Sequence, residues 1–182
     1  IRNLDTNFLL NSVLVTSAFY LFFLTLKDFF SKRFNNLSQN FAHFGFSLLI
    51  LSILLNNIFS KEIITNLKIG ETFKADKIQI NFESIDQKDI ENYNVIIGKF
   101  NIKNPNGDID ILKPELRIYN QPNIITSEAD IKTNLFTDKF ITMNIVQNQD
   151  FFNIRYQNKP LMIWIWISVL LICCGGIIGL FK

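Results

Sequence analysis

Residues 35–59 read NNLSQNFAHFGFSLLILSILLNNIF, and from Phe41 to Phe59 this stretch contains no Asp, Glu, Lys or Arg. A helix of about 20 apolar residues is long enough to cross the ~30 Å hydrocarbon core of a bilayer. Two further runs, Phe8–Leu26 and Leu161–Phe181, have similar length and character. The sequence therefore predicts a membrane protein with three spanning helices.

The segment between the second and third apolar runs is typical of β-structure. KIQINFESI (77–85), NVIIGKFNIKN (94–104) and KFITMNIVQ (139–147) are short and rich in β-branched and aromatic residues. NPNGD (104–108) predicts a tight turn, because Asn-Gly tolerates positive φ. Pro105 and Pro114 should lie in turns or at strand ends. We expect five or six strands in a small antiparallel sandwich or barrel.

These patterns predict an α+β membrane protein in three parts. Residues 1–59 should form two transmembrane helices, about 8–26 and 38–59, joined by a short inside loop. Residues 60–159 should form an outward-facing β-domain. Residues 160–182 should form the final transmembrane helix.

Charges in the short loops predict the orientation. Lys27, Lys32 and Arg33 outnumber Asp28 between the first two runs, and Lys182 follows the last run. By the positive-inside rule these ends face the cytoplasm or matrix, so residues 60–159 face the periplasm or intermembrane space. This outer segment carries thirteen basic and fourteen acidic residues. It therefore has no basic face for nucleic acid or anionic lipid. For the whole chain we expect membrane lipid, and no nucleic acid, among the partners.

The inventory of reactive residues argues against a self-contained enzyme. The chain has one His and two Cys, and it contains no C-x-x-C, G-x-G-x-x-G or P-loop pattern. We interpret the adjacent Cys173 and Cys174 as small buried hydrophobic residues. Glu115 and Glu128 could form an acid–base pair, but solvated or ion-paired carboxylates are more common. No catalytic residue is assigned.

His43 is the exception, because an ionisable group within a membrane span is costly and usually functional. Gln39, His43 and Ser47 recur every four residues and predict a polar stripe buried against a neighbour. Ala42 and Gly45 are small enough to let that neighbour approach closely. An interhelical hydrogen bond, a proton pathway and axial ligation of haem iron are all consistent with this pattern.

Five motifs in order resemble the C-terminal part of the CcmF family of cytochrome c haem lyases. Their family forms are LAHxG, GE, PEKRxY, TEAxI and RxYxKPxxxWIWxGxxxxxxGG. Leu116 stands where the family usually has Lys, Ser127 replaces Thr, and a Cys-Cys pair precedes the two glycines. The matching segments are AHFG (42–45), GETF (70–73), PELRIY (114–119), SEADI (127–131) and RYQNKPLMIWIWISVLLICCGGIIGL (155–180).

The resemblance implies a specific activity and a specific cofactor. Members of the family attach haem to the thiols of a C-x-x-C-H motif in apocytochrome c, and they hold a separate haem b between two membrane histidines. His43 matches one of these axial ligands, so it is the expected metal ligand. Gln39 or Ser47 could orient the other ring nitrogen. The second axial ligand and the tryptophan-rich haem-binding segment have no counterpart in this sequence.

The resemblance also implies partners. We expect the chain to be a C-terminal fragment or a split subunit, and to bind the rest of the haem lyase, thioredoxin-like and haem-carrying maturation proteins, and apocytochrome c. The abundance of Phe, Ile, Asn and Lys is typical of AT-rich genomes, which favours a mitochondrial over a bacterial inner membrane. The alternative is a non-catalytic subunit of this ancestry that scaffolds a larger respiratory or biogenesis complex.

Several aromatic residues are candidates for contact surfaces. Tyr93, Tyr119, Tyr156 and Arg117 could anchor a partner of the β-domain, although packing aromatics and a structural ion pair are the commoner interpretation. Trp164 and Trp166 begin the last apolar run, just after Lys159. This placement predicts an aromatic belt at the outer membrane interface. The alternative is that the two tryptophans contact the transferred haem.

Overall fold

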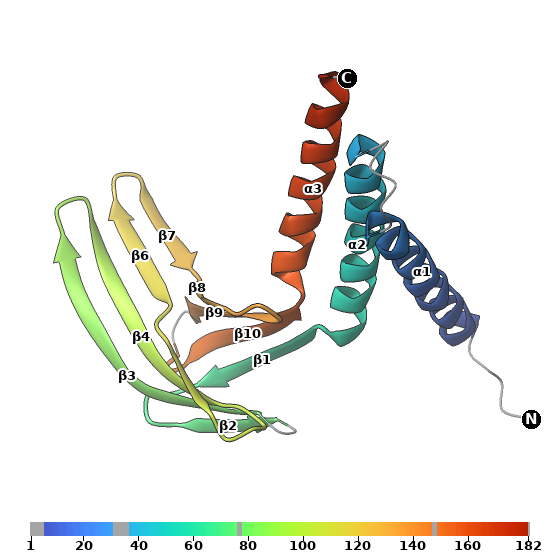
Figure 1. Cartoon of the computed structure of the whole chain (residues 1–182). Helices are drawn as coiled ribbons and strands as arrows, with labels where there is room; N and C mark the ends of the chain where they lie inside the picture. The colour runs from blue at the N-terminus through green and yellow to red at the C-terminus, as the bar shows by residue number, and fades with distance from the viewer. Residues whose placement is uncertain (1–5, 31–36, 76–77, 147–148, 182) are drawn as a thin grey trace, which may run out of the picture. The chain divides into compact units, whose positions relative to one another are not determined.

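The computed structural model describes residues 6–30, 37–75, 78–146 and 149–181, which form three helices and ten strands (Figure 1). The helices are α1 (Thr6–Phe30), α2 (Leu37–Phe59) and α3 (Met162–Leu180). The strands are β1 (Lys61–Leu67), β2 (Thr72–Ala75), β3 (Ile78–Ile90), β4 (Tyr93–Lys103), β5 (Ile109–Leu112), β6 (Glu115–Asn120), β7 (Asn123–Glu128), β8 (Asp130–Thr133), β9 (Thr137–Ile145) and β10 (Phe152–Pro160).

The fold class is confirmed. Leu9–Phe30, Leu37–Phe59 and Met162–Leu180 are each long and apolar enough to cross a membrane. All ten strands lie between the second and third of these helices. The helix α1 continues beyond Leu26, so Lys27 lies in its last turn. Lys32, Arg33 and Lys182, on which the orientation also depends, lie outside the described residues.

The chain forms two compact units, one with the helices and the short segment Asn134–Thr137, and one with the strands. In the helical unit, α2 and α3 pack backbone to backbone. A side-chain carbon added to Gly175 would lie 2.7 Å from the backbone nitrogen of Ala42, and one added to Gly45 would lie 2.9 Å from Ile172 Cγ1. The Ser38 hydroxyl donates a hydrogen bond to the Gly175 carbonyl at 2.7 Å. Small residues at this interface therefore permit a contact that larger ones would block.

Helix α1 packs on a different face of α2, through aromatic rings and one polar pair. Phe29 lies with its ring centroid 5.1 Å from that of Phe41 and 5.0 Å from that of Phe44. The hydroxyls of Thr25 and Ser47 lie 2.6 Å apart and share a hydrogen bond. Two of the three faces of α2 are thus covered within the helical unit.

The strand unit consists of two antiparallel sheets. One has the order β1-β10-β9-β8, and the other has the order β2-β3-β4-β6-β7, with β5 paired to β4. In Figure 1 the β3–β4 and β6–β7 hairpins lie side by side. The described residues contain more strands than the five or six expected, in part because β2, β5 and β8 have only four residues each and β5 and β6 are separate strands on either side of Pro114.

The core of the strand unit is apolar and centred on stacked rings. Phe82 and Phe100 are fully buried and lie 4.3 Å apart between ring centroids, with Phe152 edge-on at 5.6 Å from Phe82. Burial of rings of this size contributes much of the stability of a small domain. The other buried members are Leu67, Ile78, Ile80, Ile102, Leu112, Leu116, Ile141, Met143, Ile154 and Tyr156.

The predicted turn at residues 104–108 is present between β4 and β5. Gly107 adopts φ +90°, and its amide donates to the Asn104 carbonyl at 3.0 Å. The Asn104 amide donates in turn to the Asp108 carbonyl at 2.8 Å. Pro105 lies in this turn and Pro114 lies between β5 and β6, so both prolines avoid the strands as expected.

A buried carboxylate lies beside this turn. Asp110 is 7% exposed and accepts from Lys132 Nζ at 2.6 Å, from Lys139 Nζ at 2.5 Å and from Asn104 Nδ2 at 2.8 Å. Burial by itself raises the pKa of Asp110, but the hydrogen bonds from the two lysines and Asn104 outweigh it and hold the pKa well below its usual range. The carboxylate is therefore ionised and fully partnered in the folded protein.

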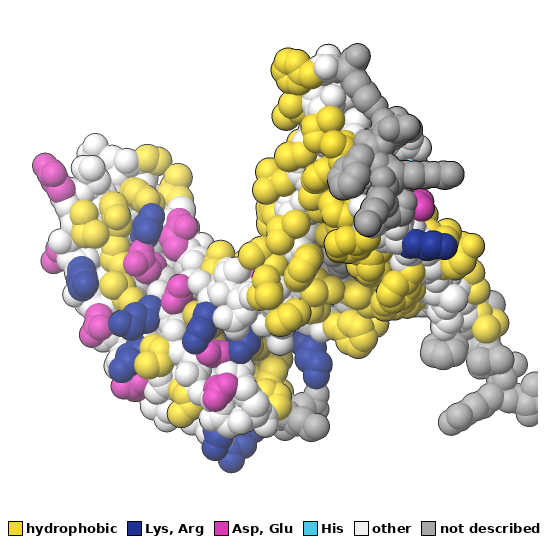
Figure 2. Space-filling view, viewed as in Figure 1, with side chains coloured by type: hydrophobic (Ala, Val, Ile, Leu, Met, Phe, Trp, Pro, Cys, Tyr) yellow, Lys and Arg dark blue, Asp and Glu magenta, His cyan; other side chains and the backbone are white. Residues whose placement is uncertain are grey.

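The surfaces of the two units differ in chemistry. Figure 2 shows hydrophobic side chains covering the helical unit and charged side chains of both signs scattered over the strand unit. Among the exposed apolar residues of the helices are Leu10, Val13, Phe23, Trp166 and Leu170. Such a surface suits contact with lipid or with other membrane helices.

The Gly175 contact predicts a position-specific effect in α3. Gly175→Ala should lower the free energy of unfolding by about 1–3 kcal/mol, because its methyl group meets the α2 backbone. The matched control is Gly176→Ala, where no atom lies within 4 Å of an added carbon. SDS titration of the full chain in mild detergent, followed by the fluorescence of the two α3 tryptophans, measures both. Equal effects of the two variants would contradict the packing described.

The Asp110 network predicts an acid-dependent stability. Asp110→Asn should destabilise the protein at neutral pH by about 3 kcal/mol, because it leaves Lys139, 12% exposed, without its carboxylate. The native pKa lies below the unfolded value of about 3.9, so this difference should be constant above that value and shrink as the pH falls below it. Thermal unfolding of the full chain in nanodiscs, followed by the β-sheet amide I band, measures the difference.

The control for Asp110 is Glu83→Gln, which removes the partner of Lys99 in an exposed ion pair. Such pairs are screened by solvent and contribute little. A stability loss in the Glu83 variant as large as that in the Asp110 variant, or a difference for Asp110 that does not vary in acid, would argue against a special role for the buried pair.

Candidate functional site

His43 lies on the third face of α2, which neither α1 nor α3 covers. Its side chain is exposed, as are those of Gln39, Phe46 and Ile53 on the same face. Phe46 is 54% exposed and Ile53 is 49% exposed. His43 thus shares an exposed face of α2 with one amide side chain and two apolar ones.

The predicted polar stripe is divided between two faces. Ser47 is fully buried toward α1, where its hydroxyl donates to the Phe44 carbonyl at 2.9 Å and pairs with Thr25. Successive residues of an α-helix are rotated by about 100°, so a spacing of four advances by about 40° per step. From Gln39 to Ser47 the drift amounts to about 80°, so Ser47 lies at the edge of the stripe that meets α1. Within the described chain Ser47 is buried while Gln39 and His43 are exposed, so the stripe is not covered there by a single neighbour. The Ser47 hydroxyl is engaged by Phe44 and Thr25, which leaves Gln39 as the candidate for orienting the His43 ring.

The surroundings of His43 narrow its possible roles. Among the residues that the structure describes, none makes a hydrogen bond or an ion pair with its imidazole. The interhelical hydrogen bond considered from the sequence is therefore not made within the described chain. With no described residue bonded to either ring nitrogen, His43 suits a role as a ligand or a proton-transfer residue. The helix begins at Leu37, so His43 lies about 9 Å along its axis at ~1.5 Å per residue.

The two cysteines lie on the surface of α3. Cys173 and Cys174 are exposed and free, and the expectation that they are buried within the chain was wrong. The reason is that α3 uses its Gly175 side, not the cysteines, to contact α2. Across the described residues, no group of three or more His, Cys, Asp or Glu is placed to hold a metal ion. Any metal bound at His43 would need a further ligand from elsewhere.

The tryptophans at the start of α3 have different environments. The Trp164 indole N–H donates to the Leu135 carbonyl at 2.9 Å, whereas Trp166 is 66% exposed. The Leu161 amide donates to the Phe136 carbonyl at 2.8 Å. The segment Asn134–Thr137 is therefore hydrogen-bonded to the start of α3. Leu135 and Phe136 are 52% and 64% exposed. Leu135 and Phe136 were not predicted from the sequence. Because they are apolar, exposed and adjacent to the tryptophans, they extend the predicted aromatic belt.

The tyrosines proposed as anchors of the strand unit are engaged in packing. The Tyr93 and Tyr119 rings lie 5.1 Å apart, and the guanidinium carbon of Arg117 lies 5.5 Å from the Tyr93 ring centre. Arg117 also pairs with Glu115 at 3.0 Å. These contacts favour the structural interpretation of the cluster. Tyr156 is fully buried, so the suggestion that it anchors a partner at the surface was wrong. Burial raises its pKa to about 12.

Glu115 and Glu128 do lie together, as cross-strand partners on β6 and β7. Glu115, however, is bound by Arg117, both through Nε at 3.2 Å and through the terminal nitrogen at 3.0 Å. The arrangement supports a structural ion pair over an acid–base pair.

Comparison with known proteins supplies the family. The family profile described as CcmF C-terminal beta-sandwich matches residues 58–160. Cytochrome c-type biogenesis protein NrfE of Haemophilus influenzae is 23% identical over 171 residues, which are 93% of this chain and 27% of that protein. The protein ccl1 of Rhodobacter capsulatus is 26% identical over 136 residues, 75% of this chain and 21% of that protein. The chain thus spans about a quarter of the length of the curated relatives it matches.

A solved structure extends the likeness to the helices. The structure titled Cytochrome c Heme Lyase CcmF matches 97% of this chain with a TM-score of 0.63, over 34% of its own length and at 15% identity. This likeness shows a shared fold that includes the three helices as well as the strands. With more than half of the chain matched by the family profile, the protein belongs to the CcmF family and contains its C-terminal β-sandwich.

Proposed function

We propose that this chain is the C-terminal part of a cytochrome c haem lyase, which attaches haem covalently to the C-x-x-C-H thiols of apocytochrome c. Its membership of the CcmF family supports this, as do relatives named as cytochrome c-type biogenesis proteins. The chain is not catalytic by itself in this proposal. The remaining three quarters of the matched relatives' length correspond to other segments or another subunit.

The observation that carries the proposal is the exposure of His43 on the free face of α2. A neutral imidazole nitrogen is a common axial ligand of haem iron. The exposed Phe46 on the same face is an apolar surface against which a porphyrin could pack, and Gln39 could accept from or donate to the second ring nitrogen. These residues fit one side of a haem b site, and the other axial ligand would come from another segment or chain. Haem bound there would supply reducing equivalents.

The strand unit is proposed as a docking domain. Its carboxylates, arginine and tyrosines on β4, β6 and β7 are held in structural contacts, which suits a stable surface better than a reactive centre. The partners proposed are the rest of the haem lyase, thioredoxin-like and haem-carrying maturation proteins, and apocytochrome c. We place the chain in an energy-transducing inner membrane, mitochondrial in preference to bacterial, with residues 60–159 on the intermembrane-space or periplasmic side.

The second candidate is a non-catalytic subunit that scaffolds a larger respiratory or biogenesis complex. The ion pair of Arg117 with Glu115 and the buried Tyr156 suit this candidate as well as the first, because neither assigns chemistry to the strand unit. The two candidates differ in whether haem iron is bound at His43.

The haem b proposal predicts a specific spectral loss. A reduced-minus-oxidised spectrum of the native complex containing the chain should show a b-type signal that His43→Ala removes, because the iron loses an axial ligand. His43→Met should restore haem binding with a shifted spectrum, since a thioether also binds haem iron. Asn57→Ala, an exposed polar residue on α2 at its other end, is the matched control and should leave the spectrum unchanged.

The same preparations test association of the chain with its partners. If the haem is ligated by residues of two polypeptides, His43→Ala should also reduce co-purification of the partner subunit. A b-type signal that is intact in the alanine variant would refute ligation by His43, and a native complex without haem would favour the scaffold.

A further inference from the structure

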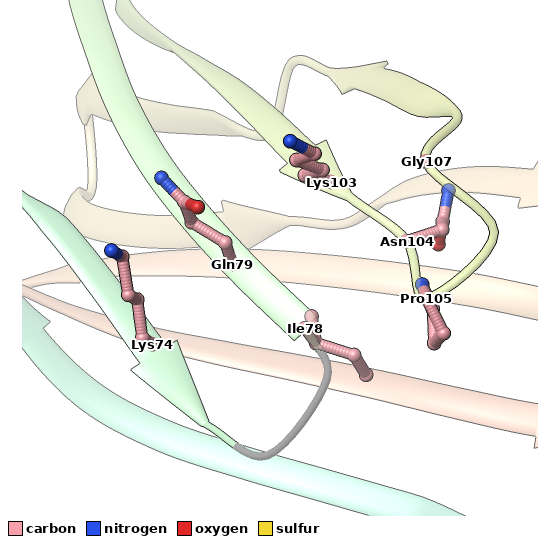
Figure 3. A pocket seen from close by; sticks show the side chains of 7 residues that line it. All are labelled: Lys74, Ile78, Gln79, Lys103, Asn104, Pro105 and Gly107. Atoms are coloured by element: carbon pink, nitrogen blue, oxygen red, sulfur yellow. The ribbon is translucent and has the colours of Figure 1, made fainter.

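A row of polar side chains crosses three neighbouring strands on the outer side of the six-stranded sheet. Lys74 of β2 is the cross-strand partner of Gln79 of β3, and Gln79 is the partner of Lys103 of β4. Residues directly opposite each other in antiparallel strands point to the same face. Figure 3 shows these three side chains on one side of their strands. Two ammonium groups therefore flank one amide on a regular, hydrogen-bonded surface.

This row forms one wall of a cleft of about 380 Å³. The turn between β4 and β5 forms the other wall, through Asn104, Pro105 and Gly107. At Gly107 the backbone has φ +90°, a conformation that few other residues adopt without strain. The cleft is thus built from a sheet face and a tight turn, both of which are held by backbone hydrogen bonds.

The turn is further anchored from behind by the buried Asp110 network. Asn104 Nδ2 donates to Asp110 Oδ2 at 2.8 Å, and Asn104 Oδ1 accepts from Lys139 Nζ at 2.8 Å. Asp110 is buried and the Lys139 side chain is only 12% exposed, so Asn104 is held by two hydrogen bonds to a largely buried ion pair. A site whose supporting residues are fixed in this way needs little reorganisation to bind a ligand.

Among the described residues, the side chains that line the cleft carry a net positive charge. Its described lining includes two lysines and no carboxylate. Lys74 and Lys103 are exposed and make no ion pair with any described residue, in contrast to Lys99, Lys132 and Lys139. The nearest carboxylate of the turn, that of Asp108, accepts from the Asn106 side chain and is not part of the lining.

We propose that this cleft binds an oxyanion, a phosphate or carboxylate group, between Lys74 and Lys103 and over Gln79. Neighbouring strands lie about 4.8 Å apart, so the two lysine backbones are separated by roughly 10 Å. A lysine stem reaches about 6 Å, so both ammonium groups can converge on one anion above the central glutamine. The Gln79 amide donates a third hydrogen bond. The anion neutralises two like charges that otherwise repel one another.

The test uses inorganic phosphate as the probe and the full chain in phosphatidylcholine nanodiscs. Isothermal titration should show saturable binding to the wild type, weakened about tenfold or more in Lys74→Gln/Lys103→Gln, because charge-assisted hydrogen bonds are the strong ones. The matched control is Lys88→Gln/Lys113→Gln, which removes the same charge from two exposed lysines outside the cleft. Equal phosphate affinity in the two double variants, or no saturable binding to the wild type, would overturn the proposal.

A measurement on the unaltered protein makes the test independent of the folding of the variants. Phosphate should slow the acetylation of Lys74 and Lys103, measured by mass spectrometry, and leave that of Lys88 and Lys113 unchanged. Uniform acetylation with and without phosphate would reject the site.

Nanodiscs that also contain phosphatidylglycerol distinguish the two sources of the anion. A lower apparent phosphate affinity in these discs means that a lipid headgroup competes for the cleft. An unchanged affinity means that the site takes a soluble anion. Either result supports an oxyanion site, provided that the Lys74→Gln/Lys103→Gln variant has lost phosphate affinity.

Discussion

The close approach of α2 and α3 at Gly175 is the constraint on which the arrangement of the helical unit depends. With the Ala42 nitrogen 2.7 Å from where a side-chain carbon would lie, the two backbones meet with no side chain between them. This contact turns one face of α2 toward α3, while Phe41, Phe44 and neighbouring side chains occupy the face toward α1. His43 is left on the remaining face by rotation alone, because each residue advances the helix by about 100°.

That placement explains how an ionisable side chain is tolerated in an apolar helix. Within the described chain His43 faces outward, beside the exposed Phe46 and Ile53, and it makes no polar contact there. Leaving an imidazole unpaired against lipid would be costly. This cost supports the proposal that another membrane segment covers this face, and the chain spans about a quarter of the length of its relatives.

In the strand unit, the same residues support both stability and the proposed anion cleft. The buried carboxylate of Asp110 forms ion pairs with Lys132 and Lys139 and accepts a further hydrogen bond from Asn104. Asn104 in turn closes the tight turn that lines the cleft. The apolar core around Phe82 and Phe100 supplies the bulk of the burial, whereas the ion network determines the geometry of one end of the sheets.

Sequence patterns by themselves determined the three apolar helices, the β-rich segment between them, the Asn-Gly turn and the singular position of His43, because each depends on local periodicity or on one residue's chemistry. Tertiary structure decided what depends on contacts between distant residues: the burial of Ser47 apart from His43, the exposure of the cysteines, the burial of Tyr156, and the convergence of Lys74, Gln79 and Lys103. A four-residue spacing in the sequence does not predict which face of the helix a neighbour will cover. The register between strands is set only when the strands pair.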